Sequence, residues 1–424
     1  MRSPLPKRRD GRTRTLQRYS TLLAAFAIAP WLCAAHAQAP ATASAEAPVP
    51  IGMVLAKQGF VADSAIDGAN GAMLEVEQHG AKVLGRPIKL IWYDEPNPQA
   101  AQQNMTRLIE QDKVVAVIGG SASASSMAIS AVAATAKIPT IIVFGAASEL
   151  TGAKCNRYTF RTATTTDFAA RALAPELLKK GKKWYFLVAN YSFGQGMYDS
   201  SVDFLKQHGG SDVGHDLVPN GTADFSSLLL KVRQADPDVV VVALGGVDLD
   251  NLLKQFPQYA GRAELGTPLI SDSAIWAAGS GAQGLYGKQW HYADAGNSAD
   301  ERAFVKAWRA KYDDKPPSNG AWQGWMSMRM LLAAIERAHT TDGPAVAKTL
   351  ETLKLPGGGS MPDYYRSWDH QFIHQLDVAR AHPPVPGRDK WDMLDIIDKV
   401  PRRLADVDAL YGTPASVGCK MGNF

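Results

Sequence analysis

Apolar runs and amphipathic segments alternate through the first part of the chain. Between residues 51 and 144 this pattern predicts the element order βαβαβαβ. The helices carry apolar residues every three or four positions, as at Ile66, Ala69 and Met73, whereas the strands are continuous apolar runs. Such runs, separated by helices, are typical of a parallel sheet with both faces covered. The predicted strands are 51–55, 88–93, 114–118 and 138–144, and the predicted helices are 66–78, 99–111 and 125–135.

A second round of the same alternation follows. The helix over 225–235 is expected to be capped by Asp224 or Thr222. Because each round spans about 120 residues, the pattern predicts an α/β protein of two doubly wound, Rossmann-like lobes rather than one large sheet. The predicted helices of this round are 168–178, 196–208, 225–235 and 249–258, and the predicted strands are 184–189, 238–244 and 268–270.

The last third of the chain does not begin a third lobe. Three predicted helices are followed by only two predicted strands, so these elements are expected to return and complete the two earlier lobes. Several chain crossings between two lobes make a hinge with a ligand cleft. The predicted helices are 299–312, 322–338 and 345–353, and the predicted strands are 372–379 and 391–397. The predicted boundaries are 51–163 for lobe 1, completed by about 296–360; 164–295 for lobe 2, completed by about 361–400; and 401–424 for a tail.

The first 37 residues have the pattern of an export signal. They contain seven basic residues and one acid, an apolar run that ends at Pro30, and the small-x-small sequence Ala35-His36-Ala37. This order predicts a signal peptide, residues 1–37, cleaved near Ala37, followed by a flexible Ala- and Pro-rich leader over 38–50. The alternatives are a buried N-terminal helix and lipid attachment at Cys33.

Charge and motifs exclude several classes of function. Without the signal, 38 basic and 40 acidic residues remain, and this balance argues against a nucleic-acid partner. The chain has no Gly-x-Ser-x-Gly, His-Glu-x-x-His or phosphate-loop motif, and Gly194-Gln-Gly196 lacks the third glycine of a dinucleotide fingerprint. His370 and His374 are four residues apart but lie where extended chain is expected, so they would not face one metal. We therefore expect neither an enzyme nor a cofactor nor a metal site.

Two cysteines remain after the predicted cleavage site, Cys155 and Cys419. In an oxidising compartment an even pair favours a disulfide, which here would close a loop of over 260 residues and tether the tail to the body. Two unrelated buried thiols are the alternative.

Several short motifs together resemble a known family. Their order and spacing are similar to those of type 1 periplasmic solute-binding proteins of ABC transporters, of the branched-chain amino acid (Leu/Ile/Val) type. The motifs are Asp67-Gly68-Ala69, Val117-Ile118-Gly119-Gly120 with the serine-rich stretch to Ser126, Ile138-Pro139, Gly145 to Thr151, Phe193 to Gly196, and Asp224-Phe225-Ser226. The resemblance implies a periplasmic monomer that closes on a small ligand and docks on an ABC permease of the inner membrane. Cys155 and Gly418-Cys419 resemble a variant of this family with a tethered tail.

One wall of the expected site is the glycine- and serine-rich loop over 120–126. Small residues at a strand end that leads into a helix expose backbone N–H groups, which bind carboxylates, and Ser123 or Ser125 could donate to the same anion. A tight turn with a solvated start is the alternative. By the resemblance, Ser123 matches the family's carboxylate-binding serine. Gly145 and Ala146 match its second backbone contact, and Ala147 stands where amino-acid binders carry threonine.

The opposite wall is expected to come from lobe 2. By the resemblance Phe193 closes over the ligand, with Tyr191 nearby, although an aromatic after a strand is often a core residue. Asp248 or Asp272 could accept from a ligand ammonium, and solvated carboxylates are the alternative. Phe60 or Val61 is expected to supply an apolar contact. The expected ligand is an amino acid or another aromatic or aliphatic acid.

Residues 365–371 resemble a late motif of a branch that accompanies quinoprotein alcohol oxidation. The alternative interpretation is a lobe-crossing strand with ordinary surface polar residues. The alternative function is a periplasmic ligand-sensing protein or, from this motif, a binding protein linked to quinoprotein alcohol oxidation.

Overall fold

The structure is a computed structural model that describes residues 47–424 except 260, 359, 360 and 423. The predicted signal peptide and most of the predicted leader lie outside the described residues. The leader was predicted to extend to Pro50, but the first strand already begins at Val49, because the alternation of apolar positions starts there.

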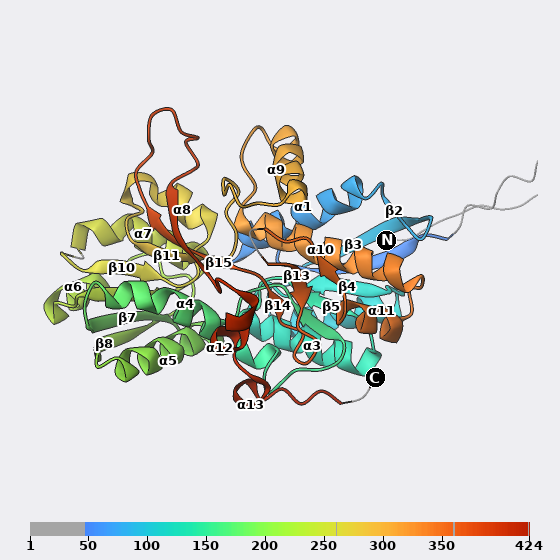
Figure 1. Cartoon of the computed structure of the whole chain (residues 1–424), viewed down its shortest axis with the longest axis horizontal. Helices are drawn as coiled ribbons and strands as arrows, with labels where there is room; N and C mark the ends of the chain where they lie inside the picture. Colours follow the sequence, from blue (N-terminus) through green and yellow to red (C-terminus); the bar gives the residue numbers. More distant parts are fainter. Residues whose placement is uncertain (1–46, 260, 359–360, 423) are drawn as a thin grey trace, which may run out of the picture. The chain divides into compact units, whose positions relative to one another are not determined.

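Lobe 1 is built on a six-stranded sheet in the order β2-β3-β1-β4-β5-β6 (Figure 1). The pairs from β3 through β6 are parallel, and only the short β2 pairs antiparallel with β3. The strands are β1 Val49–Val54, β2 Lys82–Val83, β3 Arg86–Tyr93, β4 Ala116–Gly119, β5 Thr140–Ile142 and β6 Thr159–Arg161.

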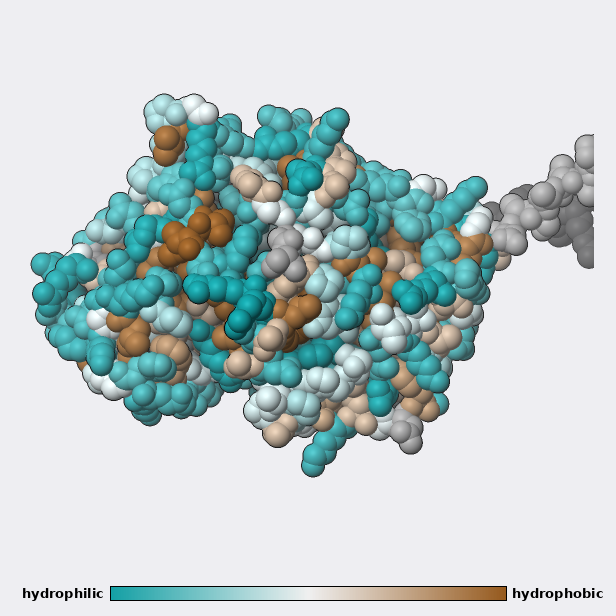
Figure 2. All heavy atoms as spheres, viewed as in Figure 1, coloured by the Kyte–Doolittle hydropathy of each residue, from teal (hydrophilic) through white to brown (hydrophobic). Residues whose placement is uncertain are grey.

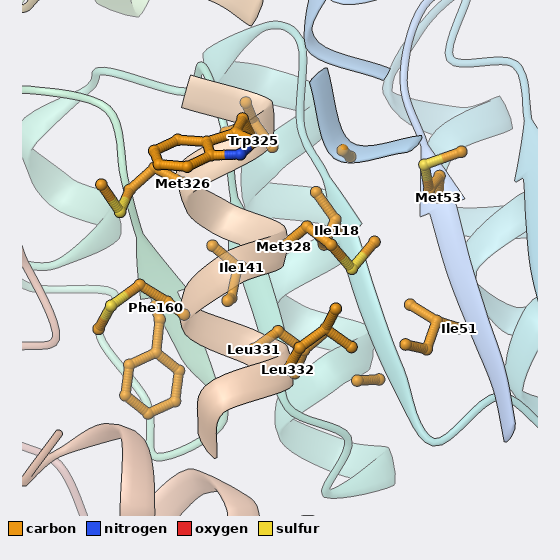
Figure 3. Packing of buried hydrophobic residues seen from close by; sticks show 14 of the residues in the cluster. Ile51, Met53, Ile118, Ile141, Phe160, Trp325, Met326, Met328, Leu331 and Leu332 are labelled. Carbon is orange, nitrogen blue, oxygen red and sulfur yellow. The ribbon is translucent and has the colours of Figure 1, made fainter. Parts of the chain in front are cut away.

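Helices cover both faces of this sheet. One hydrophobic cluster joins β1 and β4 to α1, α10 and α11, and another joins the opposite face to α2 and α3. In the first cluster Ile51 and Ile118 pack with Leu331 of α10 (Figure 3). The helices are α1 Ala62–Gln78, α2 Pro98–Glu110, α3 Ser123–Ala136, α9 Ala299–Lys311, α10 Asn319–Ala338 and α11 Gly343–Leu350.

The contact between α1 and α10 depends on glycine. A Cβ at Gly71 would lie 1.9 Å from the carbonyl oxygen of Ala321, and a Cβ at Gly324 would lie 1.8 Å from that of Gly68. Two helix backbones therefore meet directly. This close approach holds the N-terminus of α10 beside the first turn of α1.

Lobe 2 contains a seven-stranded sheet in the order β16-β15-β11-β10-β9-β7-β8. Its centre is parallel, and β15 and β16 add antiparallel strands at one edge. The strands are β7 Lys183–Ala189, β8 Ser211–Val218, β9 Val239–Ala243, β10 Glu264–Thr267, β11 Leu285–Lys288, β15 Leu376–Ala381 and β16 Leu394–Val400. Helices α6 Ser226–Ala235, α7 Gly246–Tyr259 and α8 Asp272–Ala278 cover one face, and α4 Thr166–Leu178 and α5 Ser192–Gln207 cover the other. The predicted fold class, two doubly wound α/β lobes, is confirmed.

Some predicted elements are wrong in detail. The strand predicted at 268–270 lies at 264–267, because Pro268 has no N–H to donate to a sheet. The strand predicted at 372–379 is divided into β14 Phe372–Ile373 and β15, because the chain passes between the lobes there. The N-cap of α6 is Phe225, whose side chain makes no capping bond; Asp224 instead accepts from the N–H of Ser226 at 2.8 Å.

Within the described residues the chain passes between the lobes at 162–165, 289–298 and 374–375, and the C-terminal tail passes between them once more after β16. Side-chain amides link these crossings. Gln289 donates to the carbonyl of Thr162 at 2.7 Å, and Gln371 donates to that of Ala163 at 2.9 Å. The first two crossings are therefore bonded to each other, and the segment 365–371, just before the third crossing, is bonded to the first; we call these crossings and this segment the hinge.

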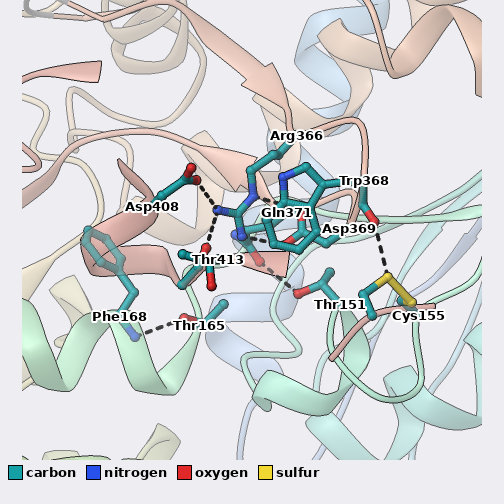
Figure 4. A network of polar contacts seen from close by, with 12 residues as sticks. Thr151, Cys155, Thr165, Phe168, Arg366, Trp368, Asp369, Gln371, Asp408 and Thr413 are labelled. Atoms are coloured by element: carbon teal, nitrogen blue, oxygen red, sulfur yellow. Dashed lines mark hydrogen bonds and ion pairs between the residues drawn. A yellow bond between two sulfur atoms is a disulfide. The ribbon is translucent and has the colours of Figure 1, made fainter. Parts of the chain in front are cut away.

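Residues 365–371 belong to this hinge. Arg366 forms an ion pair with Asp369 at 2.5 Å (Figure 4), and His370 and Gln371 are fully buried. The interpretation of this segment as a strand with surface polar residues is wrong, since only its start lies in a strand, β13 Asp363–Tyr365, which pairs between β14 and β12 Lys354–Leu355.

The C-terminal tail contacts both lobes. The predicted disulfide between Cys155 and Cys419 is confirmed and ties the tail to lobe 1. On the lobe 2 side, the ring of Tyr411 stacks on Phe168 at 3.8 Å, and Arg171 donates to the carbonyl of Leu410 at 3.0 Å. The tail thus crosses the hinge. It contains η3 Leu404–Asp406, α12 Val407–Tyr411 and α13 Pro414–Val417.

The surface in Figure 2 is mostly hydrophilic, with hydrophobic side chains in separate small groups. Among the described helices, none combines the length and the hydropathy that a membrane crossing requires.

Candidate functional site

A cleft between the two lobes contains two adjoining cavities, of about 150 Å³ and about 120 Å³. Ser64, Phe144 and Phe193 line both cavities, which are therefore two parts of one cleft. We call the part formed by Ser121, Ala122 and Ser123 the serine end, and the part that contains Asp63, Asp67 and Asp272 the acidic end.

Ser123 is the first residue of α3 and lies at the serine end. Its hydroxyl oxygen accepts from the N–H of Ala147 at 3.2 Å, so the two predicted segments meet. The hydroxyl proton of Ser123 remains available to donate. The first N–H groups of a helix have no acceptor within the helix, and they add positive potential at the same place. Ala146 lines the neighbouring cavity, and Gly145 precedes it.

Arg161 fixes the position of Ala147 from behind. This fully buried guanidinium donates to the carbonyl of Ala147 at 2.5 Å and to the side chain of Gln371 at 2.8 Å. Burial lowers the pKa of Arg161 to about 10. Because Gln371 belongs to the hinge, Arg161 links the hinge directly to the ligand-facing loop.

Glu95, which was not predicted as a site residue, already occupies part of the predicted anion site. Its carboxylate accepts from the N–H groups of Gly120 at 3.2 Å, Ser121 at 2.8 Å and Ala122 at 3.2 Å. Burial raises the pKa of Glu95 to about 7, although the hydrogen bonds, including that from Ser125, favour the ionised form. Ser125 is therefore directed to Glu95 and lines neither cavity. An acid two residues after the 88–93 strand was the available signal, although β1 lies between that strand and β4, which ends at Gly119.

Aromatic side chains lie in and beside the cleft: Phe193 lines both cavities and Tyr191 the smaller one, whereas Phe60 lines neither. Tyr191 and Phe193 lie at the start of α5 with their rings stacked at 5.9 Å, and Phe60 of lobe 1 meets Tyr191 edge-on at 5.9 Å. Backbone contact accompanies this ring pair, since the N–H of Val247 donates to the carbonyl of Phe60 at 3.1 Å. Gly246, with φ of +59°, is needed there because a Cβ would lie 2.0 Å from that oxygen.

The two predicted acids have different surroundings. Asp248 is in the first turn of α7, accepts from the N–H of Gly221 at 2.9 Å and lines neither cavity. Burial raises the pKa of Asp248. Asp272 lines the acidic end, but both of its oxygens have protein partners: the Lys288 ammonium at 2.6 Å and the N–H of Asn319 at 2.6 Å.

Two further acids at this end were not predicted as site residues. Asp67 accepts from the hydroxyl of Ser318 at 2.6 Å, and burial raises its pKa. Asp63 is exposed in the first turn of α1. Asp67 stands in a motif that carried the resemblance, and its position one helical turn after Asp63 was the available signal.

The cleft therefore offers hydrogen-bond donors at one end, aromatic surface in the middle and carboxylates at the other end. This arrangement suits a small dipolar or aromatic molecule held by non-covalent contacts. Among the described residues no group of three or more His, Cys, Asp or Glu side chains is placed to hold a metal ion. His370 and His374 bond instead to Glu351 at 2.9 Å and to Asp363 at 2.8 Å.

Comparison with known proteins gives consistent matches. The model of the periplasmic binding protein family matches residues 48–384. A Leu/Ile/Val-binding protein homologue of Brucella suis is 25% identical over 358 residues, covering 77% of this chain and 86% of that protein.

Two solved structures show the same fold. A periplasmic binding protein of Burkholderia mallei has a TM-score of 0.81 at 24% identity and covers 89% of this chain and 99% of its own. A solute-binding protein of an ABC transporter from Rhodopseudomonas palustris, in complex with 3,4-dihydroxybenzoic acid, has a TM-score of 0.75 at 21% identity and covers 83% of this chain and 97% of its own.

The family expected from the motifs is confirmed, because the matching model spans most of the described residues and both lobes. The chain belongs to the periplasmic binding protein family, among the type 1 proteins related to Leu/Ile/Val-binding proteins.

Proposed function

We propose that this protein is the exported substrate-binding component of an ABC importer, and that it binds a small carboxylate-bearing solute in the cleft. The proposal rests on one observation: inside the cleft between the lobes, Ser123 at the N-terminus of α3 is hydrogen-bonded to the N–H of Ala147. A hydroxyl donor at a helix N-terminus is suited to a carboxylate.

The dimensions and polarity of the cleft limit the ligand. The larger cavity of the cleft, about 150 Å³, has the volume of a cavity in another protein that holds one benzene ring, and the second cavity adds about 120 Å³. We therefore expect a solute of the size of an amino acid or a substituted benzoate. The carboxylate of either ligand would bind beside Ser123, and its apolar part would contact Phe193. An amino acid would direct its ammonium toward the acidic end. The bound acid of the Rhodopseudomonas relative and the name of the Brucella relative support these two classes.

The mechanism is closure about the hinge. We propose that the lobes predicted at 51–163 and 164–295, each with its returning segment, move as units about the hinge. A ligand that contacts both lobes stabilises the closed state because it binds that state more tightly. The closed monomer would then dock on the permease in the inner membrane and release the solute, with no covalent chemistry.

A thermal-shift screen of the purified protein against leucine, benzoate and 3,4-dihydroxybenzoate tests the ligand class. A solute that binds only the folded protein stabilises it by about 2.7 kcal/mol at one hundred times its dissociation constant. A rise in melting temperature with at least one of these acids is expected. The absence of a rise with these and with other small carboxylates would refute carboxylate binding.

Calorimetric titration of Ser123→Ala with the acid found in the screen tests the site. The loss of one charge-assisted hydrogen bond is expected to weaken binding by about 1–2 kcal/mol. Ser227→Ala, on the exposed side of α6, is the matched control and should bind like the wild type. Equal affinities of both variants would remove Ser123 from the site.

A further inference from the structure

Asp272 connects the two lobes at the acidic end of the cleft. It is the first residue of α8 in lobe 2, yet one of its oxygens accepts from the N–H of Asn319, the first residue of α10 in lobe 1, at 2.6 Å. Only 3% of Asp272 is exposed, so this hydrogen bond is shielded from water.

The N-terminus of α10 is a favourable place for a carboxylate. The helix has 20 residues, and the side chain of its N-cap Ser318 accepts from the N–H of Ala321, at 3.1 Å, rather than from that of Asn319. The N–H of Asn319 therefore needs another acceptor, and an anion at this position also interacts favourably with the helix dipole. The carboxylate of Asp272, from the opposite lobe, supplies both the acceptor and the negative charge.

Lys288 holds Asp272 in position from within lobe 2. Its ammonium lies 2.6 Å from the second oxygen of Asp272, and the side chain of Lys288 is fully buried on β11. Because both members of this ion pair belong to lobe 2, the pair does not depend on contact with lobe 1. Asp67 of lobe 1 is bonded to Ser318 and does not contact the N–H of Asn319.

We propose that Asp272 is a closure residue, whose carboxylate, held by Lys288, binds the N-terminus of α10 each time the lobes close. It is thus a contact between the lobes rather than the acceptor for a ligand ammonium that the sequence suggested. The bond from Val247 to Phe60, beside the aromatic residues, also joins the two lobes. The inference concerns closure itself and holds whichever solute binds.

Two substitutions of Asn319 distinguish the loss of its N–H bond to Asp272 from the loss of its side chain. Asn319→Pro removes the N–H that Asp272 accepts, and proline is well tolerated at the first position of a helix. Ser318 has φ of −76° and ψ of 165°, the extended conformation that a following proline requires. Asn319→Ala is the matched control, because it removes the same side chain and keeps the N–H.

Small-angle X-ray scattering of the protein without added solute measures the ratio of open to closed molecules, and amide hydrogen exchange measures protection of the N–H of Asn319. A hydrogen bond to a charged group is worth enough to shift this ratio roughly ten- to a hundredfold. We expect Asn319→Pro to shift the ratio toward the open form, whereas Asn319→Ala should resemble the wild type and keep a protected amide.

The proposal is overturned if both variants scatter like the wild type, if both open equally, or if the Asn319 amide of the wild type exchanges without protection. Should Asn319→Pro fail to fold, the double variant Asp272→Ala with Lys288→Met removes the ion pair as a unit and should open in the same way. Since no ligand is added, failure of the ligand screen leaves this test unaffected.

Discussion

The disulfide between Cys155 and Cys419 should contribute strongly to stability because of the length of chain that it closes. The two cysteines are 264 positions apart. In the chain-entropy description, a loop of this length lowers the entropy of the unfolded chain by an amount worth about 5.6 kcal/mol at 25 °C. Unfolded chains keep some compactness, so we expect the double variant Cys155→Ser with Cys419→Ser to lose about 4 kcal/mol.

This loss can be expressed as a melting temperature. At about 2.1 cal/mol/K of unfolding entropy per residue, the roughly 380 residues from 47 onward give about 0.8 kcal/mol/K. The double variant should therefore melt about 5 °C below the oxidised wild type. Wild-type protein treated with a thiol reductant should melt at the same temperature as the variant, since both lack the same covalent bond.

The assay is thermal unfolding followed by circular dichroism. A difference below 1 °C would refute the argument from loop entropy. The calculation also assumes that the tail stays in place through its own contacts when the disulfide is absent. A difference well above 7 °C would refute this assumption. Those contacts include the stacking of Tyr411 on Phe168 and the bonds from Arg366 to Asp408 at 3.3 Å and to the carbonyl of Gly412 at 2.8 Å.

Two other substitutions test the energetics of the site and of lobe 1. Burial raises the pKa of Glu95 to about 7, above its value in the unfolded chain, so the folded state binds the extra proton and stability should fall as pH rises from about 4.5 to about 7. Glu95→Gln should remove about 3 kcal/mol of this pH dependence, measured by urea unfolding at pH 5 and pH 8; an unchanged difference between the two pH values would contradict it. Gly324→Ala places a methyl group 1.8 Å from the carbonyl oxygen of Gly68 and should destabilise the protein by about 2–3 kcal/mol in the same assay, whereas a neutral effect would show that α1 and α10 can separate at no cost.

Much of the fold could be predicted because buried parallel strands are continuous apolar runs. The run Val239-Val240-Val241-Val242 identifies β9 without ambiguity. In contrast, β8 lies at the edge of its sheet and mixes Asp212, His215 and Asp216 with few apolar residues, so its sequence resembles a loop. Hydrophobic periodicity identifies an edge strand poorly, because such a strand need not be apolar.

Site residues could be predicted only where the order of strands in a sheet brings their loops together. Ser123 and Ala147 follow β4 and β5, which are neighbouring parallel strands, so their segments had to meet at one sheet edge. Glu95 follows β3, which β1 separates from β4, so the pairing of neighbouring strands did not by itself place Glu95 beside Gly120. The partners of Asp272 could not be predicted, because its contact with Asn319 depends on how one lobe lies against the other.

The interleaved order of the two lobes constrains how such a protein can change by recombination. The cluster that packs against β1 needs Trp322 and Trp325 of α10, which follow the parallel strands of lobe 2, and the lobe 2 sheet in turn needs β15 and β16, which follow α10. A single crossover between related genes, at any point from β7 to β11, would combine mismatched halves of both cores. New ligand preferences are therefore expected to arise by substitutions along the cleft rather than by exchange of a whole lobe.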